Sequence, residues 1–140
     1  MNQLDRLNEL IRASRQEVIV NGRYAIGEAF RELFIHYPDV ARISWSQYTP
    51  HFNDGDVCEF EVGDLYMVKK CDLEEAIKDE REAPDYDYQT CHQGSRDPAE
   101  RDFYNLFNSI ETEMMLLVFG DGYWVRITRD DIQVEEYDHD

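Results

Sequence analysis

Hydrophobic residues at every second position predict strands in the middle and near the C-terminal end of this sequence. Residues 42–49 and 57–63 both alternate in this way, which is the pattern of a strand with one buried face. Asn53-Asp54-Gly55-Asp56 between them is typical of a turn, so the two segments predict a hairpin. The same alternation predicts three further strands, at residues 65–68, 123–127 and 132–134.

A spacing of three and four residues predicts helices at the N-terminus. Leucine and isoleucine residues fall on one side of an amphipathic helix predicted over residues 1–22. A second helix is predicted over residues 23–36, and Pro38 is expected to end it because proline disfavours a helical residue before it. Asn21-Gly22 is expected to interrupt the two helices, which then form either an antiparallel pair or one kinked rod.

The strongest helix signal starts at Asp97. This residue is a predicted N-cap, Pro98 occupies the first helical position and Glu100 completes a capping box. Apolar residues then continue at helical spacing up to Gly120, so a single long helix is predicted. A shorter helix is expected at residues 72–81.

These elements predict an α+β fold in a single domain of residues 1–140. Strands joined by short turns pair as an antiparallel sheet, and the helices lie apart from them in the sequence. We therefore expect an antiparallel sheet of about five strands, with two N-terminal helices and one long helix packed against it. Residues 82–96 have no hydrophobic period and are predicted to form a long loop.

Negative charge is the main deviation in composition. The formal net charge is −17, which disfavours direct binding to nucleic acid or to an anionic membrane and favours a basic partner. Residues 1–36 hold five acidic residues and five arginines, so the whole excess lies in residues 37–140. The acidic residues gather at 52–64, 72–88 and 130–140. This asymmetry indicates either an interaction surface or a solvated acidic exterior.

The cysteine content and the hydropathy favour a cytoplasmic protein. Cys58, Cys71 and Cys91 are an odd number without the spacing of a disulfide framework. The sequence shows no signal peptide, and no apolar run approaches the roughly 20 residues that a membrane span needs.

Sequence motifs do not predict a particular reaction. Asn53-Asp54-Gly55-Asp56 has the oxygen ligands and the glycine of half a calcium loop, but position twelve, counted from Asp54, is Leu65 instead of glutamate. The three cysteines lack the paired C-x-x-C arms of a zinc site. No cofactor or metal is therefore predicted, and a small metal-dependent enzyme is kept only as an alternative.

Two segments carry a resemblance to a family. They read W-S-Q-Y-T-P-H-F-N-D-G-D-V-C-E-F and F-G-D-G-Y-W-V-R-I-T-R-D-D-I-Q-V-E-E-Y-D-H-D. Over about 24–67 and 102–140 the chain resembles small uncharacterised proteins of tailed phages and some bacteria that share W-x-Q-Y-T-P-x-F-N-D-G-D. His51 replaces the aromatic residue that members have after the proline, and Asp131 replaces a glycine of the last turn. The resemblance implies a phage source and a similar architecture, but no site residue.

The preferred interpretation is an acidic protein-binding module, expected to be a phage-encoded inhibitor that occupies the basic surface of a host nucleic-acid-binding or defence protein as a DNA mimic. The alternatives are an accessory or assembly protein without a charge-specific partner, and the metal-dependent enzyme. A homodimer through the N-terminal helices is a further expectation. Nine residues are predicted to contact the partner: Asp54, Asp56, Glu59, Glu61, Tyr86, Tyr88, Glu135, Glu136 and Asp138.

Overall fold

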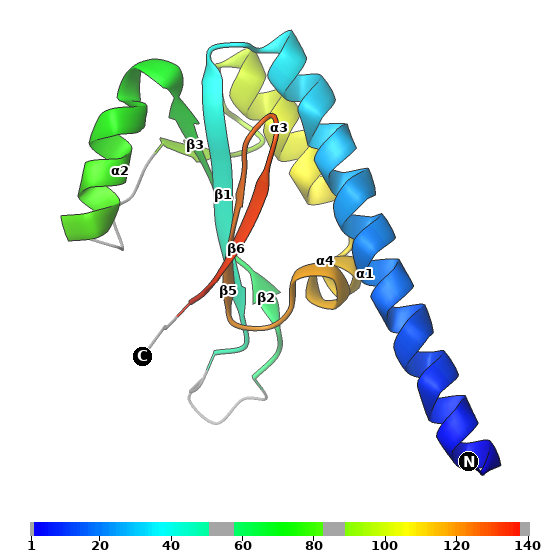
Figure 1. Cartoon of the computed structure of the whole chain (residues 1–140). Coiled ribbons are helices and arrows are strands. Elements are labelled where there is room, and N and C mark those ends of the chain that lie inside the picture. The colour runs from blue at the N-terminus through cyan, green and yellow to red at the C-terminus, as the bar shows by residue number, and fades with distance from the viewer. Residues whose placement is uncertain (1, 51–57, 83–88, 138–140) are drawn as a thin grey trace.

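The computed structural model describes residues 2–50, 58–82 and 89–137 and has an α+β fold (Figure 1). Its elements are α1 (Gln3–His36), β1 (Val40–Tyr48), β2 (Glu61–Val62), β3 (Leu65–Lys69), the 3-10 turn η1 (Lys70–Asp72), α2 (Leu73–Glu82), β4 (Gln89–Cys91), α3 (Pro98–Ser109), α4 (Thr112–Phe119), β5 (Tyr123–Ile127) and β6 (Ile132–Glu136). The six strands form one antiparallel sheet in the order β4-β3-β1-β5-β6, with β2 beside β1. The predicted fold class is confirmed.

β1 is the central strand of the sheet. It pairs with β5 along one side and with both β3 and β2 along the other. Gly63 separates β2 from β3; its N–H donates to the Ser46 carbonyl over 2.8 Å. A Cβ at Gly63 would lie 3.0 Å from that oxygen, so the close approach favours glycine. The predicted central hairpin is present, but the described part of its second strand is shorter than residues 57–63.

The hydrophobic core lies between the sheet and three helices, α1, α3 and α4, which lie on one side of it (Figure 1). Ile43 and Trp45 of β1 are fully buried there, as their alternation with serine residues predicted. The helices contribute aromatic residues that pack on Trp45, with ring centroids 5.1 Å away for Phe107 and 5.7 Å away for Phe119. The central strand is therefore held by large apolar side chains from two separate helices.

α1 is one continuous helix, so the expected interruption is wrong. Of the two arrangements left open, the antiparallel pair is wrong and a single rod is present. Gly22 does not interrupt α1; it faces α4, where a Cβ on Gly22 would lie 2.6 Å from Cγ2 of Val118. Glycine is thus needed for the close approach of two helices and not for a break. α1 ends at His36, before Pro38, as predicted. None of the helices in the described ranges combines the length and the apolar character that crossing a membrane requires.

The long C-terminal helix expected from Asp97 to Gly120 is in fact two helices. The N-cap is confirmed, because Oδ1 of Asp97 accepts the Ala99 N–H over 2.9 Å. Ile110 then adopts extended backbone angles, and α4 starts after Glu111 in a new direction. Gly120 ends α4 with a φ of +93°, a conformation that glycine adopts without strain.

The segment predicted as a loop, 82–96, contains the edge strand β4. Cys91 lies opposite Leu65 of β3, and both side chains are buried in the core. A three-residue strand is too short to show a hydrophobic period, so the sequence pattern missed it. The short helix and the final hairpin of β5 and β6 agree with the prediction.

Candidate protein-interaction face

In the described part of the chain, no helix lies over the second face of β1, β5 and β6. α1, α3 and α4 lie together on one side of the sheet, and α2 lies on the other side next to β3 (Figure 1). Directly paired residues of neighbouring strands point to the same side, so the strand register identifies the side chains on this second side, which we call the open face. Its members include Ser46, Tyr48, Glu61, Tyr66, Trp124, Arg126, Gln133 and Glu135.

Four aromatic rings of the open face form one cluster. Tyr137 follows β6, and its ring centroid lies 5.1 Å from that of Tyr48 and 5.2 Å from that of Trp124. Tyr66 extends the row to β3, with its centroid 6.4 Å from that of Trp124. All four side chains are half-buried, so the rings pack on one another and still expose part of their surface. We call these four residues the aromatic cluster.

Arg126 and Glu135 lie beside the aromatic cluster on neighbouring strands. Nη1 of Arg126 is 2.8 Å from Oε2 of Glu135, and the guanidinium lies 5.6 Å from the ring centroid of Trp124. The Arg126 side chain is 15% exposed, whereas that of Glu135 is 62% exposed. The arginine is therefore held against the ring and its charge is compensated, while Glu135 keeps most of its surface accessible.

The fold places acidic residues from two distant runs on the same face of the sheet. Glu61, from the run at 52–64, lies opposite Tyr48, and Glu135, from the run at 130–140, lies opposite Trp124. Both glutamates are exposed. Two of the predicted contact residues thus stand next to rings of the aromatic cluster.

The other predicted contact residues are distributed differently. Glu59 is exposed just before β2. Glu136 is also exposed, but it pairs with Tyr123 and so points away from the open face. The remaining five lie outside the described residues: Asp54, Asp56, Tyr86, Tyr88 and Asp138.

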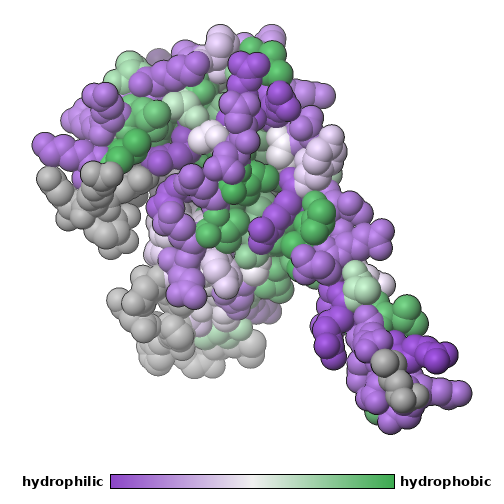
Figure 2. Space-filling model, viewed as in Figure 1, coloured by the Kyte–Doolittle hydropathy of each residue, from purple (hydrophilic) through white to green (hydrophobic). Residues whose placement is uncertain are grey.

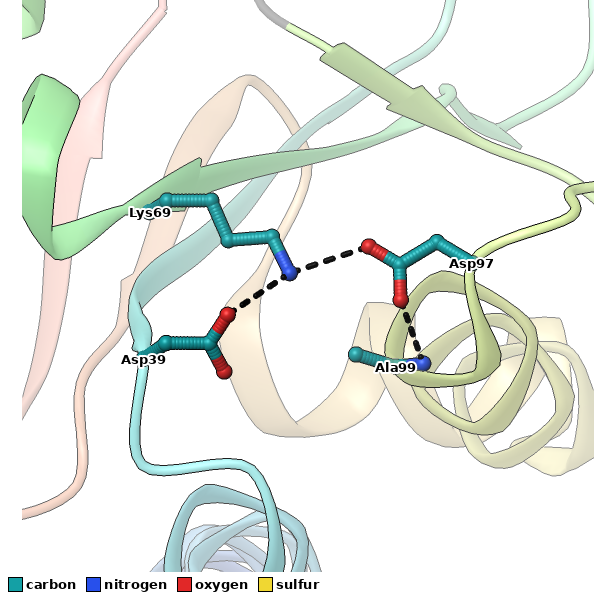
Figure 3. A network of polar contacts seen from close by, with 4 residues as sticks. All are labelled: Asp39, Lys69, Asp97 and Ala99. Atoms are coloured by element: carbon teal, nitrogen blue, oxygen red, sulfur yellow. Dashed lines mark hydrogen bonds and ion pairs between the residues drawn. The ribbon is translucent and has the colours of Figure 1, made fainter.

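A second group of charged residues, centred on Lys69, joins three elements (Figure 3). Nζ of Lys69 lies 3.2 Å from a carboxylate oxygen of Asp39 and 2.9 Å from one of Asp97, the N-cap of α3. Burial opposes the charged form of Lys69, but the hydrogen bonds of Asp97 and Asp39 outweigh it and raise the Lys69 pKa. The Lys69 ammonium in turn lowers the pKa of Asp97. The charges satisfy one another, so we interpret this group as a structural link.

Buried Gln47 fixes α4 to the sheet. Its Nε2 donates to the carbonyls of Met115, over 2.9 Å, and Gly120, over 2.7 Å, which lie in α4 and just after it. Its Oε1 accepts the indole N–H of Trp45 over 2.9 Å. An amide on the apolar face of a strand therefore has a partner for both of its polar groups, as burial requires.

Among the described residues, no three histidine, cysteine or acidic side chains gather as a metal site would require. The turn predicted at Asn53-Asp54-Gly55-Asp56, whose residues match only half of a calcium loop, lies outside the described residues. Cys91 is buried, and burial, followed by the negative charge of Glu100, raises the pKa of its thiol to about 12. At neutral pH Cys91 is thus a thiol, which is neither a nucleophile nor a good metal ligand.

Among the hollows lined by described residues, two lie on the helix side of the structure. The larger, of about 380 Å³, lies between α1 and the turn that joins β5 to β6, and Arg31, Arg129 and Asp131 are among its lining residues. The smaller, of about 370 Å³, lies between Phe60 and α4. The residues that line these two hollows do not include the aromatic cluster.

Sequence reasoning placed both Tyr66 and Trp124 in strands but did not identify the aromatic cluster. A signal was present in the alternation, because these residues and Tyr48 occupy positions that the pattern leaves pointing away from the core. A tryptophan or tyrosine there is unusual and could have been noted.

Comparisons of the chain with models of protein families, with curated proteins and with solved structures found no match.

Proposed function

We propose that the protein is a binding module that holds a basic protein partner on its open face. The observation that carries the proposal is the aromatic cluster, four partly exposed rings with the exposed carboxylates of Glu61 and Glu135 beside them. Lysine and arginine side chains are recognised by such a pair of groups, since rings attract cations through their faces and carboxylates accept charged hydrogen bonds. The net charge of −17 draws basic partners toward the chain.

The proposed partner is a protein whose basic surface normally binds nucleic acid. Such a surface carries several lysine or arginine residues with bound counterions, and an acidic protein can displace nucleic acid from it. The resemblance to phage-encoded proteins supports a host nucleic-acid-binding or defence protein as the partner, in the host cytoplasm. The chain would then act as a competitive inhibitor without catalysing a reaction.

Affinity capture from a bacterial lysate at low salt tests this function. We expect the immobilised chain to retain a basic nucleic-acid-binding protein, to release it at about 0.5 M salt because exposed charges are screened, and to lose it to an excess of duplex DNA. Trp124→Ala should reduce the retained amount at least tenfold, an order of magnitude typical of an aromatic contact residue.

Tyr24→Ala is the matched control, because Tyr24 is an aromatic residue that is 72% exposed on α1, away from the open face. It should retain the partner as the unchanged chain does. Retention of no basic protein would overturn the proposed function. Equal retention by Trp124→Ala and Tyr24→Ala would show that the open face is not the contact surface.

A further inference from the structure

The N-terminal half of α1 extends beyond the rest of the molecule (Figure 1). Where α1 meets the body, Gly22 faces Val118, and Nε of Arg23 donates to the Val118 carbonyl over 3.2 Å. Residues 2–18 are all exposed. Residues 3–21 alone span about 28 Å at the rise of an α-helix. An unsupported helix of this length is only marginally stable in water, so a contact that covers it would stabilise it.

This protruding segment has an apolar seam. Leu4, Leu7 and Ile11 follow the three- and four-residue spacing of a two-helix interface, and Val18 comes seven residues later on the same side, after the polar Ser14. Each of the four apolar residues is at least 40% exposed. The seam runs toward Gly22, where α1 meets α4. Figure 2 shows hydrophobic residues on this outer part of the helix among hydrophilic ones.

The seam continues onto α4. Met114 and Leu117 are 41% and 42% exposed. Met114 is one helical turn before Val118, the residue that packs on Gly22, and positions three or four apart share one side of a helix. A helix laid along the seam would therefore reach α4 at the point where α1 enters the body.

The charge distribution favours a second copy of the chain as the occupant. Residues 2–21 hold three acidic residues, Asp5, Glu9 and Glu17, and three arginines, Arg6, Arg12 and Arg15. The protruding segment is thus neutral in a chain whose net charge is −17. Two copies repel one another when their bodies approach, but not when these helices do.

We propose that two copies of the chain form a dimer in which their α1 helices pack antiparallel along this seam. The antiparallel direction keeps the two acidic bodies at opposite ends of the helix pair, whereas a parallel pair would bring them side by side. It also closes a two-fold interface, in which Leu7 of each copy lies opposite Val18 of the other. The N-terminal turn of each α1 then covers Met114 and Leu117 of the second copy.

Sedimentation equilibrium of the whole chain tests the dimer. Leu7→Glu with Ile11→Glu should raise the dimer dissociation constant more than tenfold, because it places charges in the apolar seam. The matched control, Val20→Glu with Ile35→Glu, adds the same charge at two exposed apolar positions on other sides of α1 and should change the constant less than about threefold. Circular dichroism checks that both variants are folded. A monomer at every concentration, or equal effects of the two variants, would overturn the dimer.

Disulfide trapping tests the direction of the helices in a background with Cys58→Ser and Cys71→Ser. Chains with Leu7→Cys mixed with chains with Val18→Cys should form a covalent dimer on oxidation, and either chain alone should not. Crosslinking of each chain with itself would demonstrate a parallel pair and overturn the proposed arrangement.

Salt separates the dimer from the proposed function. Raising the salt concentration should strengthen the dimer, because repulsion between the bodies is screened, and should weaken binding of a basic partner. Failure of one proposal therefore leaves the other unaffected.

Discussion

The two faces of the same sheet use their aromatic residues in opposite ways. Trp45, on the helix-covered face, is fully buried and its indole N–H is bound by Gln47. Trp124, on the open face, is half-buried and packs with Tyr137 and Arg126 at the surface. One tryptophan therefore belongs to the core, whereas the other reaches the surface that we propose for binding. The comparison shows that the two faces of one sheet can give the same residue type a buried and a partly exposed position.

The largest expected effect separates the two tryptophans. Trp45→Ala removes a ring enclosed by Phe30, Phe107 and Phe119, and it should lower the free energy of unfolding by about 3–5 kcal/mol. Trp124→Ala should lower it by only about 1–2 kcal/mol, because part of that side chain is already in contact with water. Denaturant unfolding measures both. Equal losses would contradict the division of roles between the faces.

A smaller effect is expected at Gln47, the polar residue of the covered face. Gln47→Leu leaves the indole N–H of Trp45 and the carbonyls of Met115 and Gly120 without this partner, and it should cost about 2–3 kcal/mol in unfolding free energy. Gln133→Leu on the open face is the matched control and should cost less than about 0.5 kcal/mol, since Gln133 is exposed. A cost for Gln47→Leu no larger than the control would show that the amide is not needed to hold α4.

The smallest of the three effects concerns the edge between the faces, where Lys69 joins β3 to Asp97. Lys69→Met should lower the unfolding free energy by about 1 kcal/mol at neutral pH. The matched control, Lys70→Met, should have little effect, because in the described structure Lys70 is exposed and the ion pair to Asp97 is made by Lys69. The difference in unfolding free energy between wild type and Lys69→Met measures how much the Lys69 ion pairs stabilise the fold.

The pH dependence of that difference follows from the two pKa shifts. The folded pKa of Asp97 is lowered, so its contribution is present above about pH 4, its unfolded pKa, and is lost as the pH falls through the folded value. The folded pKa of Lys69 is raised, so its contribution is present below about pH 10 and is lost as the pH rises further. The difference should thus be constant between about pH 5 and 9. Denaturant unfolding between about pH 5 and 9 measures this difference in unfolding free energy. A steady change across the range would contradict the assignment of the pH dependence to Asp97 and Lys69.

Local patterns in the sequence determined most of the elements. The alternation around Trp45 defined β1, the alternation after Tyr123 defined β5 and β6, and Asp97 with Pro98 marked the start of α3. These signals depend on neighbours in the chain, such as the two-residue period of a strand or the capping of the first helical turn. They also established that the negative charge lies outside residues 1–36.

Contacts between distant segments decided the rest. The predicted interruption at Gly22 is wrong because the sequence around Gly22 does not reveal the residue that it packs on. That residue, Val118, is 96 positions away. Likewise, nothing near Ile110 in the sequence marks the helix break that lets α4 reach Gln47. The aromatic cluster depends on the register of three strands, which places Tyr48 and Trp124 next to Tyr137. A helix or strand forms from local preferences, but its break points and the side chains it shares a surface with depend on the free energy of packing across the whole fold.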